Sequence, residues 1–242
     1  VYHDRDNDGV FDRPGEEGIG GVTAELIVNG ASTGITAVTS TTTGKVGYYE
    51  FTNLAPGIYT VREVQPAGWL DGKDTAGSHG GVAGNDVISG IALNFGDKAV
   101  EYNSGELLPG WFQGRVHGDP GEGCNFDDPQ NPLAGVRIDL LDAQGTLLAT
   151  TYTDSDGYYK FNGLAPGEYQ IRQHQPEGYF DGGERVGTAG AQSHDVPGVF
   201  SFFTGIMLTS GFDAVNYDFC EKPPASISGR VHAHTGPNCD FD

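Results

Sequence analysis

The sequence predicts an all-β protein built from tandem antiparallel β-sandwich modules in an elongated array. The composition is typical of strands joined by turns, because 39 of the 242 residues are glycine and 11% are aromatic. Apolar side chains also recur at every second position in several stretches, which is the period of a strand buried on one face. A long internal repeat is the third observation.

The repeat has a period of about 115 residues. Residues 47–70, GYYEFTNLAPGIYTVREVQPAGWL, match residues 157–180, GYYKFNGLAPGEYQIRQHQPEGYF. Further along, AVEYN at 99–103 recurs as AVNYD at 214–218, a shift of 115 residues (214 − 99). Each copy is long enough to form one sandwich of immunoglobulin size.

A third copy begins near the end of the chain, where SGRVHAH at 228–234 repeats QGRVHGD at 113–119. We therefore expect three units. Module 1 spans residues 1–107 and is truncated at its N-terminal side, module 2 spans 108–222, and 223–242 supply the first strand and loop of a truncated third module.

Each module is expected to contain six to eight short strands and no helix. The residues at 55–58 place Pro and Gly at the central positions of a type II turn between two of them. In module 1 the predicted strands lie at 22–26, 49–54, 59–61 and 87–93. In module 2 the corresponding strands lie at 136–140, 159–164, 169–171 and 202–208.

The charge of the chain excludes several classes of partner. It carries 33 acidic residues against 13 Lys and Arg, a net charge of −20. Nucleic acids and anionic membrane surfaces are bound mainly through Lys and Arg, so neither is expected as a partner. No run approaches the roughly 18 apolar residues of a membrane-spanning helix, so no membrane insertion is expected. The acidic balance suits a protein that meets divalent cations or high salt.

Residues 3–17 read HDRDNDGVFDRPGEE and place three aspartates at alternate positions. Calcium requires six to eight oxygen ligands, which an EF-hand loop supplies from regularly spaced residues. Positions 1, 3, 5, 6, 7 and 9 of such a loop are filled in order by Asp4, Asp6, Asp8, Gly9, Val10 and Asp12.

Position 12, the last ligand of the loop, falls on Gly15. Counted back from the next strand, Glu16 takes that place after a one-residue insertion near Pro14, and Glu17 is the alternative. The competing interpretation is a solvated acidic turn. We predict a Ca²⁺ cofactor whose ligands are Asp4, Asp6, Asp8, Val10, Asp12 and Glu16.

The corresponding loop of module 2 predicts a weaker calcium site, because Gly121 and Gly123 replace the acids of positions 3 and 5. The predicted ligands are Asp119, Asn125 through its carbonyl, and Asp127, with Glu122 as a further donor. In module 3, His234 replaces the first aspartate, so no complete site is expected there. A further acidic group is interpreted as a solvated loop, because its spacing is irregular, and it consists of Asp71, Asp74, Asn85 and Asp86.

Three cysteines without a CxxC motif indicate neither zinc nor redox chemistry. Cys124 and Cys220 both fall in module 2, and the aligned positions of module 1 are Gly9 and Gly105. Both partners are thus missing together, as expected for a disulfide within module 2. In the competing pair, Cys220 would bond to Cys239. Cys124 would then need a partner at position 105, which is a glycine. A disulfide indicates an oxidising setting outside the cytoplasm.

The string GYYxFxxLxPGxYxxRxxxPxGxxDG, preceded by the acidic loop, resembles the SdrD-type B repeats of bacterial surface adhesins, which belong to the CnaB-like, prealbumin-type sandwich family. The resemblance covers nearly all of both modules. It implies a calcium-stabilised stalk whose partners are calcium ions and neighbouring modules of the same protein. It also implies an extracellular location, on the cell surface or secreted.

No enzymatic activity is expected, because the sequence contains no GxSxG, HExxH or phosphate-loop motif. Many CnaB-like domains form an isopeptide crosslink between a first-strand Lys and a last-strand Asn beside a buried Glu. Asn103 and Glu63 occupy suitable places. The first strands contain no lysine, however, and Gln173 stands in module 2 where module 1 has Glu63. A crosslink is therefore not expected.

Two other functions remain open from the sequence. A carbohydrate- or protein-binding module could use Trp69, Tyr179 and Trp111, the last of which is expected in the linker between modules. Alternatively, the first strand of the third module, at 226–232, could complete the sheet of a second molecule and give head-to-tail self-association by strand addition.

Overall fold

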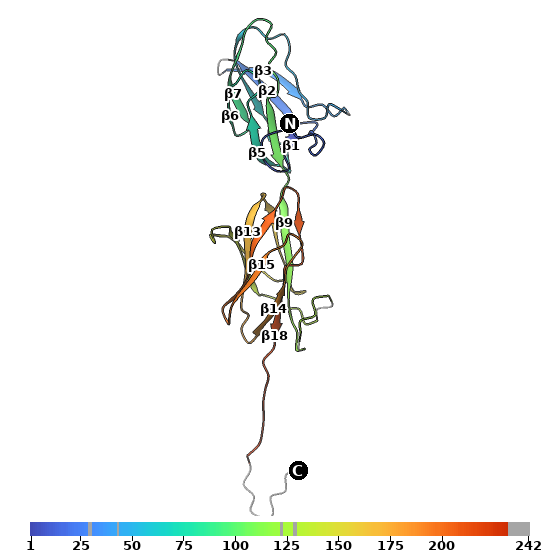
Figure 1. The fold of residues 1–242 in the computed structure, drawn as a ribbon, viewed down its shortest axis with the longest axis vertical. Helices are drawn as coiled ribbons and strands as arrows, with labels where there is room; N and C mark the ends of the chain where they lie inside the picture. The colour runs from blue at the N-terminus through green and yellow to red at the C-terminus, as the bar shows by residue number, and fades with distance from the viewer. Residues whose placement is uncertain (29–30, 43, 122, 128–129, 232–242) are drawn as a thin grey trace, which may run out of the picture.

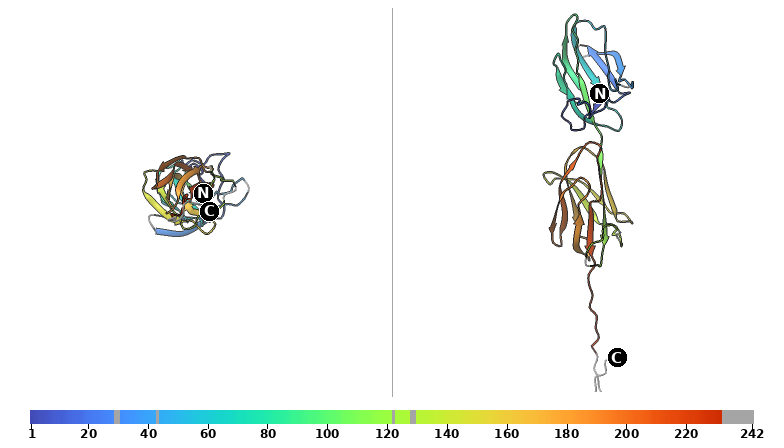
Figure 2. Two further views of the ribbon diagram at one scale, coloured as in Figure 1. Left: turned by 90° about the horizontal axis from the view of Figure 1, so that it is seen from below. Right: turned by 45° about the vertical axis from the view of Figure 1, so that its right-hand side comes forward.

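The computed structural model describes residues 1–28, 31–42, 44–121, 123–127 and 130–231. All regular structure in these ranges is β-strand, which confirms the predicted all-β class. Figure 1 shows two sandwiches placed one above the other along the longest axis, with residues 223–231 leading away from the second. Both views in Figure 2 show the same arrangement, one of them along that axis. No helix in the described ranges is long and apolar enough to cross a membrane.

Module 1 is formed by two facing sheets, one of three strands in the order β1-β8-β5 and one of five in the order β3-β2-β4-β7-β6. The first strand pairs in parallel with the last, so both run the same way along the module. Its strands are β1 (Tyr2–His3), β2 (Thr23–Val28), β3 (Ala31–Val38), β4 (Gly57–Glu63), β5 (Leu70–Thr75), β6 (Val82–Gly84), β7 (Val87–Leu93) and β8 (Asn103–Leu107).

Module 2 repeats this arrangement, with sheets ordered β11-β10-β13-β16-β15 and β12-β9-β18-β14, and β17 also pairs with β9. Its first strand again lies parallel to its last. Its strands are β9 (Gly110–Gly118), β10 (Arg137–Asp142), β11 (Leu147–Tyr152), β12 (Tyr158–Leu164), β13 (Gly167–His174), β14 (Phe180–Arg185), β15 (Gln192–Val196), β16 (Phe200–Leu208), β17 (Asp213–Ala214) and β18 (Asp218–Lys222).

Each pair of sheets encloses its own apolar core. Inward-facing residues at every second position supply it, as Tyr59 and Val61 do on β4 and Tyr169 and Ile171 do on β13. The core of module 2 is the larger and includes Phe112, Phe203, Tyr217 and Phe219 among its buried rings. Residues 108 and 109 separate β8 from β9, while the predicted module boundaries themselves stay a prediction.

Two predicted strands are absent from the described chain. Residues 49–54 form no strand, although their counterparts in module 2 form β12, which pairs with β9. Among the described residues, no strand lies beside 49–54 to hydrogen-bond with it. The predicted strand at 226–232 is likewise not formed over its described part, where Ile227 and Val231 are fully exposed.

Candidate metal centre

The acidic loop of module 1 connects β1 to β2 and is anchored at its base. The backbone N–H of Asp4 donates to the carbonyl of Glu106 on β8 (2.9 Å), and the N–H of His3 donates to the carbonyl of Glu17 (2.8 Å). The ring of Tyr2, itself buried, lies 4.9 Å from that of Phe11. The loop is therefore closed by contacts at both of its ends.

Asp4 holds the first half of the loop together. Its carboxylate is completely buried and accepts the N–H groups of Asp8 (3.1 Å) and Gly9 (2.9 Å). Gly9 has a φ of +86°, which favours glycine and turns the chain back. Carboxylate oxygens of Asp4, Asp6 and Asp8 lie within 4.8 Å of one another. Burial raises the pKa of Asp4, although its hydrogen bonds act in the opposite direction.

Glu16 closes the second half of the loop. One carboxylate oxygen accepts the N–H of Arg5 (2.7 Å) and the other accepts the N–H of Asp12 (3.0 Å). Burial raises the pKa of Glu16, and the charge of Asp4 adds to this effect. Glu17 instead forms an exposed ion pair with the guanidinium of Arg5 (2.8 Å). Glu16, and not Glu17, therefore links the two halves of the loop.

The structure brings only some of the predicted calcium ligands of module 1 close together. The group of carboxylates within 4.8 Å does not include Asp12 or Glu16. The side chain of Val10 is exposed, and its N–H donates to Asp8 (2.7 Å). The donor set consists of oxygen atoms, which fits Ca²⁺ rather than a softer metal.

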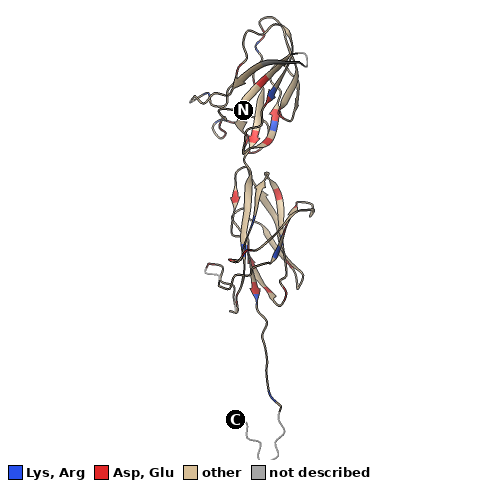
Figure 3. Ribbon diagram, turned by 180° about the vertical axis from the view of Figure 1, so that it is seen from behind, with Lys and Arg blue, Asp and Glu red and all other residues tan. Residues whose placement is uncertain are grey.

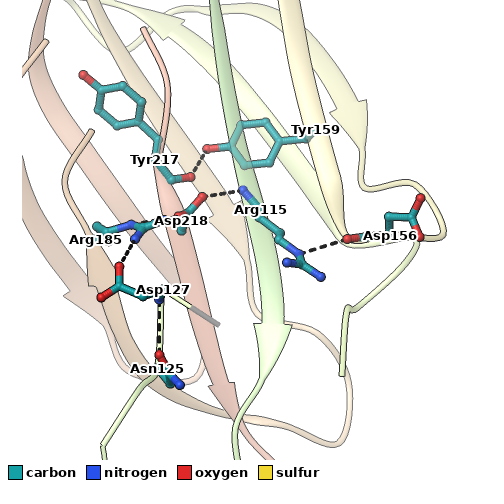
Figure 4. Close-up of polar contacts among 8 residues, drawn as sticks. All are labelled: Arg115, Asn125, Asp127, Asp156, Tyr159, Arg185, Tyr217 and Asp218. Atoms are coloured by element: carbon teal, nitrogen blue, oxygen red, sulfur yellow. Dashed lines mark hydrogen bonds and ion pairs between the residues drawn. The ribbon is translucent and has the colours of Figure 1, made fainter. Parts of the chain in front are cut away.

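Cationic side chains from β14 and β18 contact the loop of module 2. Asp127 forms an ion pair with Arg185 (3.1 Å), which also binds Asp218, as Figure 4 shows. The ammonium of Lys222 donates to the carbonyls of Gly121 (2.9 Å) and Gly123 (3.0 Å). The ion pair with Arg185 uses a carboxylate oxygen of Asp127, one of the predicted ligands.

Asp119 and Asn125, the other predicted ligands of module 2, bind the loop backbone. Asp119 accepts the N–H groups of Gly121 (2.7 Å) and Asn125 (2.9 Å), which lower its pKa. The side chain of Asn125 accepts the N–H of Asp127 (3.2 Å). Glu122 lies outside the described residues. The second calcium site stays a prediction, and the structure places Arg185 in competition with it.

The structure joins Cys124 to Cys220, with a Cα–Cα distance of 6.1 Å, which confirms the predicted disulfide. Cys239 lies outside the described residues. At the equivalent place in module 1, a Cβ atom added to Gly105 would come within 2.9 Å of the Cβ of Asp4. The calcium-type loop and the disulfide therefore occupy the same end of their modules.

The interpretation of the further acidic group of module 1 as a solvated loop is wrong, and sequence reasoning missed that Glu63 and Glu106 lie beside it. Asp71 and Asp74 lie on β5 rather than in a solvated loop, and both are only partly exposed. Glu63 on β4 and Glu106 on β8 are buried beside Asp86, with carboxylate oxygens within 4.8 Å. Figure 3 shows acidic segments on the strands of module 1 near module 2. The available signal was the inward alternation of β4, which continues from Tyr59 and Val61 to Glu63.

The aromatic residues considered for ligand binding have structural contacts. Trp69 packs edge-on against His3, with ring centres 5.1 Å apart. The expectation that Trp111 lies in a linker is wrong, because Trp111 is part of β9. The ammonium of Lys160 lies 3.7 Å from the centre of its ring. Tyr179 is partly buried in the turn before β14.

The chain is similar to parts of two staphylococcal serine-aspartate repeat-containing proteins. It is 30% identical over 238 residues to serine-aspartate repeat-containing protein F of Staphylococcus epidermidis, covering 97% of this chain and 13% of that protein. It is 29% identical over 247 residues to serine-aspartate repeat-containing protein D of Staphylococcus aureus (strain Newman), covering 98% and 17%. The chain thus spans less than a fifth of the length of these relatives.

Among solved structures, the minor pilin of Streptococcus agalactiae is 17% identical with a TM-score of 0.33, over 93% of this chain and 91% of the pilin. The shaft pilin SpaA of Lactobacillus rhamnosus GG is 12% identical with a TM-score of 0.33, over 92% and 94%. The family model of the SdrD B-like domain matches residues 1–98 and 115–220, which is most of the chain. The chain therefore belongs to the SdrD B-like domain family.

Proposed function

We propose that the chain forms calcium-binding spacer modules of an extracellular stalk, on a cell surface or secreted. The observation that carries the calcium assignment is the loop in which Asp4, Asp6 and Asp8 converge while Glu16 bridges both halves. A bound Ca²⁺ would supply the positive charge that these carboxylates lack. The membership of the chain in the SdrD B-like family and the absence of a catalytic motif support the spacer role.

The position of the loop connects calcium binding with the junction between modules. His3, the residue before the loop, hydrogen-bonds through Nε2 with the hydroxyl of Ser210 in module 2 (2.7 Å). The same hydroxyl accepts the N–H of Leu108 in the linker (2.8 Å). Because ordering the loop also orders His3, we propose that calcium stiffens the junction as well as module 1.

Calcium is expected to stabilise module 1 against thermal unfolding. At a concentration about 100-fold above the dissociation constant, one bound ion adds about 2.7 kcal/mol to the free energy of unfolding, which corresponds to a shift of several degrees or more. The double substitution Asp6→Ala and Asp8→Ala should reduce this shift, because both exposed side chains supply ligands. The measurement is calorimetry in millimolar calcium and in chelator.

Glu17→Gln is the matched control, since Glu17 forms an exposed ion pair with Arg5 rather than linking the two halves of the loop, and its loss should leave the calcium response intact. An unchanged midpoint on chelation would refute the calcium assignment. X-ray scattering of the same samples tests the junction: calcium should narrow the distribution of overall dimensions, and an identical distribution would restrict its effect to module 1.

Strand addition is a second candidate, which we propose because of a hollow in module 1. It has a volume of about 660 Å³ and is lined by Tyr49, Phe51 and Leu54, among others. The counterparts of these residues in module 2 pack against β9, whose Phe112 is completely buried. The exposed segment 226–231, SISGRV, repeats part of β9 and is the proposed occupant from a second copy. Light scattering should then show a mass that rises with concentration, and removal of residues 223–242 should abolish the rise.

A further inference from the structure

The interior of module 1 contains carboxylates that come from both of its sheets. Glu63 is the last residue of β4 in the five-stranded sheet, and Glu106 lies on β8 in the three-stranded sheet. Asp86, immediately before β7, brings a third carboxylate to the same place. One oxygen from each of the three lies within 4.8 Å of the others.

The two glutamates are buried without adequate partners. Glu63 is 4% exposed and Glu106 is 0% exposed. Among the described residues, neither carboxylate oxygen of Glu63 and only one of Glu106 has a hydrogen-bond donor, and oxygens of Asp71, Asp74 and Asp86 also lack one. A buried charge without a partner costs several kcal/mol, so such groups are normally paired, neutralised or bound to a metal.

The negative charge of these five acidic side chains is not neutralised by neighbouring Lys or Arg side chains in the described part of the chain. None of the ion pairs formed by described Lys and Arg side chains involves these five acids. Burial raises the pKa of Glu63, while the hydroxyl of Ser104 and the amino group of Val1 act in the opposite direction. That amino group donates its hydrogen bond to the carbonyl of Gly47 (2.7 Å). Burial is the main influence and raises the pKa of both Glu63 and Glu106.

In module 2 the counterpart of Glu106 accepts hydrogen bonds from two amide side chains, although Asp181, Glu184 and Asp195 form a further acidic group beside it. There Gln173 replaces Glu63, is fully buried, and donates to Glu221, the counterpart of Glu106 (2.6 Å). Gln175 donates to the second oxygen of Glu221, so both oxygens are satisfied. In module 1 only Gln65 plays such a part, donating to one oxygen of Glu106. Where module 2 has an amide donor, module 1 has a second carboxylate.

We propose that Glu63, Asp86 and Glu106 bind one calcium ion inside module 1, with Asp74 beside them, at a site distinct from the loop of residues 4–16. Calcium prefers oxygen ligands at about 2.3–2.6 Å, so two ligands of one ion lie at most about 5 Å apart, and the three carboxylates satisfy this limit. The ion takes the place of the missing hydrogen-bond donors and neutralises acids from both sheets. The proposal does not depend on the loop site.

The test is a calcium titration of the metal-free chain by calorimetry, extended to 10 mM. Glu63→Gln installs the residue that module 2 carries at this position, so the variant is expected to fold. It should bind one calcium equivalent fewer than the wild type, as should Glu106→Gln. The double substitution Asp6→Ala and Asp8→Ala should remove a different equivalent, so the two sites fail or succeed separately. Unchanged stoichiometry in both glutamine variants would overturn the interior site.

Thermal unfolding gives a second test, because the change in the unfolding midpoint caused by Glu63→Gln should reverse its sign when calcium is added. Without calcium, Glu63→Gln should raise the midpoint, because one of two facing carboxylates is removed. With calcium, it should lower the midpoint relative to the wild type, because a ligand is lost. A midpoint that rises equally in both conditions would show that the acids are merely protonated and would refute cation binding.

Discussion

Replacing Cys124 and Cys220 together by serine is expected to lower the free energy of unfolding of module 2 by up to about 4.7 kcal/mol. The bond joins residues 96 positions apart, and in the chain-entropy model a crosslink over about 100 residues restricts the unfolded chain by that amount. For a domain of this size the unfolding midpoint should fall by on the order of 20 °C. The measurement is calorimetry of the intact chain and the double variant.

Cys239→Ser is the control for this experiment, because Cys239 is not part of the bond. It should leave the midpoint of module 2 unchanged. The transition of module 1 should persist in all three proteins, since that module contains no cysteine. If the double variant is as stable as the control, the disulfide does not contribute to the free energy of unfolding of module 2.

Asp139→Asn should destabilise module 2 by about 3–5 kcal/mol near neutral pH, the range for removing one member of a buried ion pair. Asp139 lies on β10 and is completely buried. Its carboxylate accepts hydrogen bonds from Arg172 (2.6 Å) and Thr150 (2.7 Å), and lies 2.7 Å from Nε2 of His174. Asparagine keeps the shape but leaves the guanidinium of Arg172 without a counter-charge.

The same variant should reveal a pH dependence. Burial raises the pKa of Asp139, but its bonds to His174, Arg172, Thr150 and Arg137 outweigh this and hold the pKa below its usual range. A carboxyl that is more acidic in the folded state stabilises fully above its unfolded pKa, about 3.9, and progressively less as pH falls below it. The difference between wild type and variant should therefore shrink from pH 7 to pH 2.5.

Urea unfolding at pH 7, 4 and 2.5 measures this difference directly. Asp156→Asn serves as the control, because Asp156 is exposed and its substitution should change stability little at any of these pH values. A difference between wild type and Asp139→Asn that stays constant across the range would mean that the charge of Asp139 contributes nothing and only its packing matters.

The features that the sequence predicts well are those encoded locally or by repetition. The alternation in β4 and β13 indicates the strands, and the paired absence of cysteine at Gly9 and Gly105 identifies the disulfide. The loop residues are consecutive, so their spacing alone brings Asp4, Asp6 and Asp8 together. Each of these predictions requires knowledge of only one segment or one alignment.

The features that it does not predict depend on how two sheets face each other. Glu63 and Glu106 are 43 residues apart (106 − 63), and only the packing of β4 against β8 brings their side chains together. The ion pair of Arg185 with Asp127 joins β14 to the loop of module 2 in the same way. The strand expected at 49–54 fails for a related reason, because a strand forms only where a neighbouring strand pairs with it.

The parallel pairing of first and last strands, together with the disulfide, has a mechanical consequence. A pulling force enters module 2 at the start of β9 and leaves at the end of β18, so it loads their hydrogen bonds in shear. The Cys124–Cys220 bond then carries the tension past the residues between them. Those residues would otherwise extend by roughly 300 Å when unravelled. Under load, module 2 can therefore lengthen only by the residues outside the bond, 110–123 and 221–222.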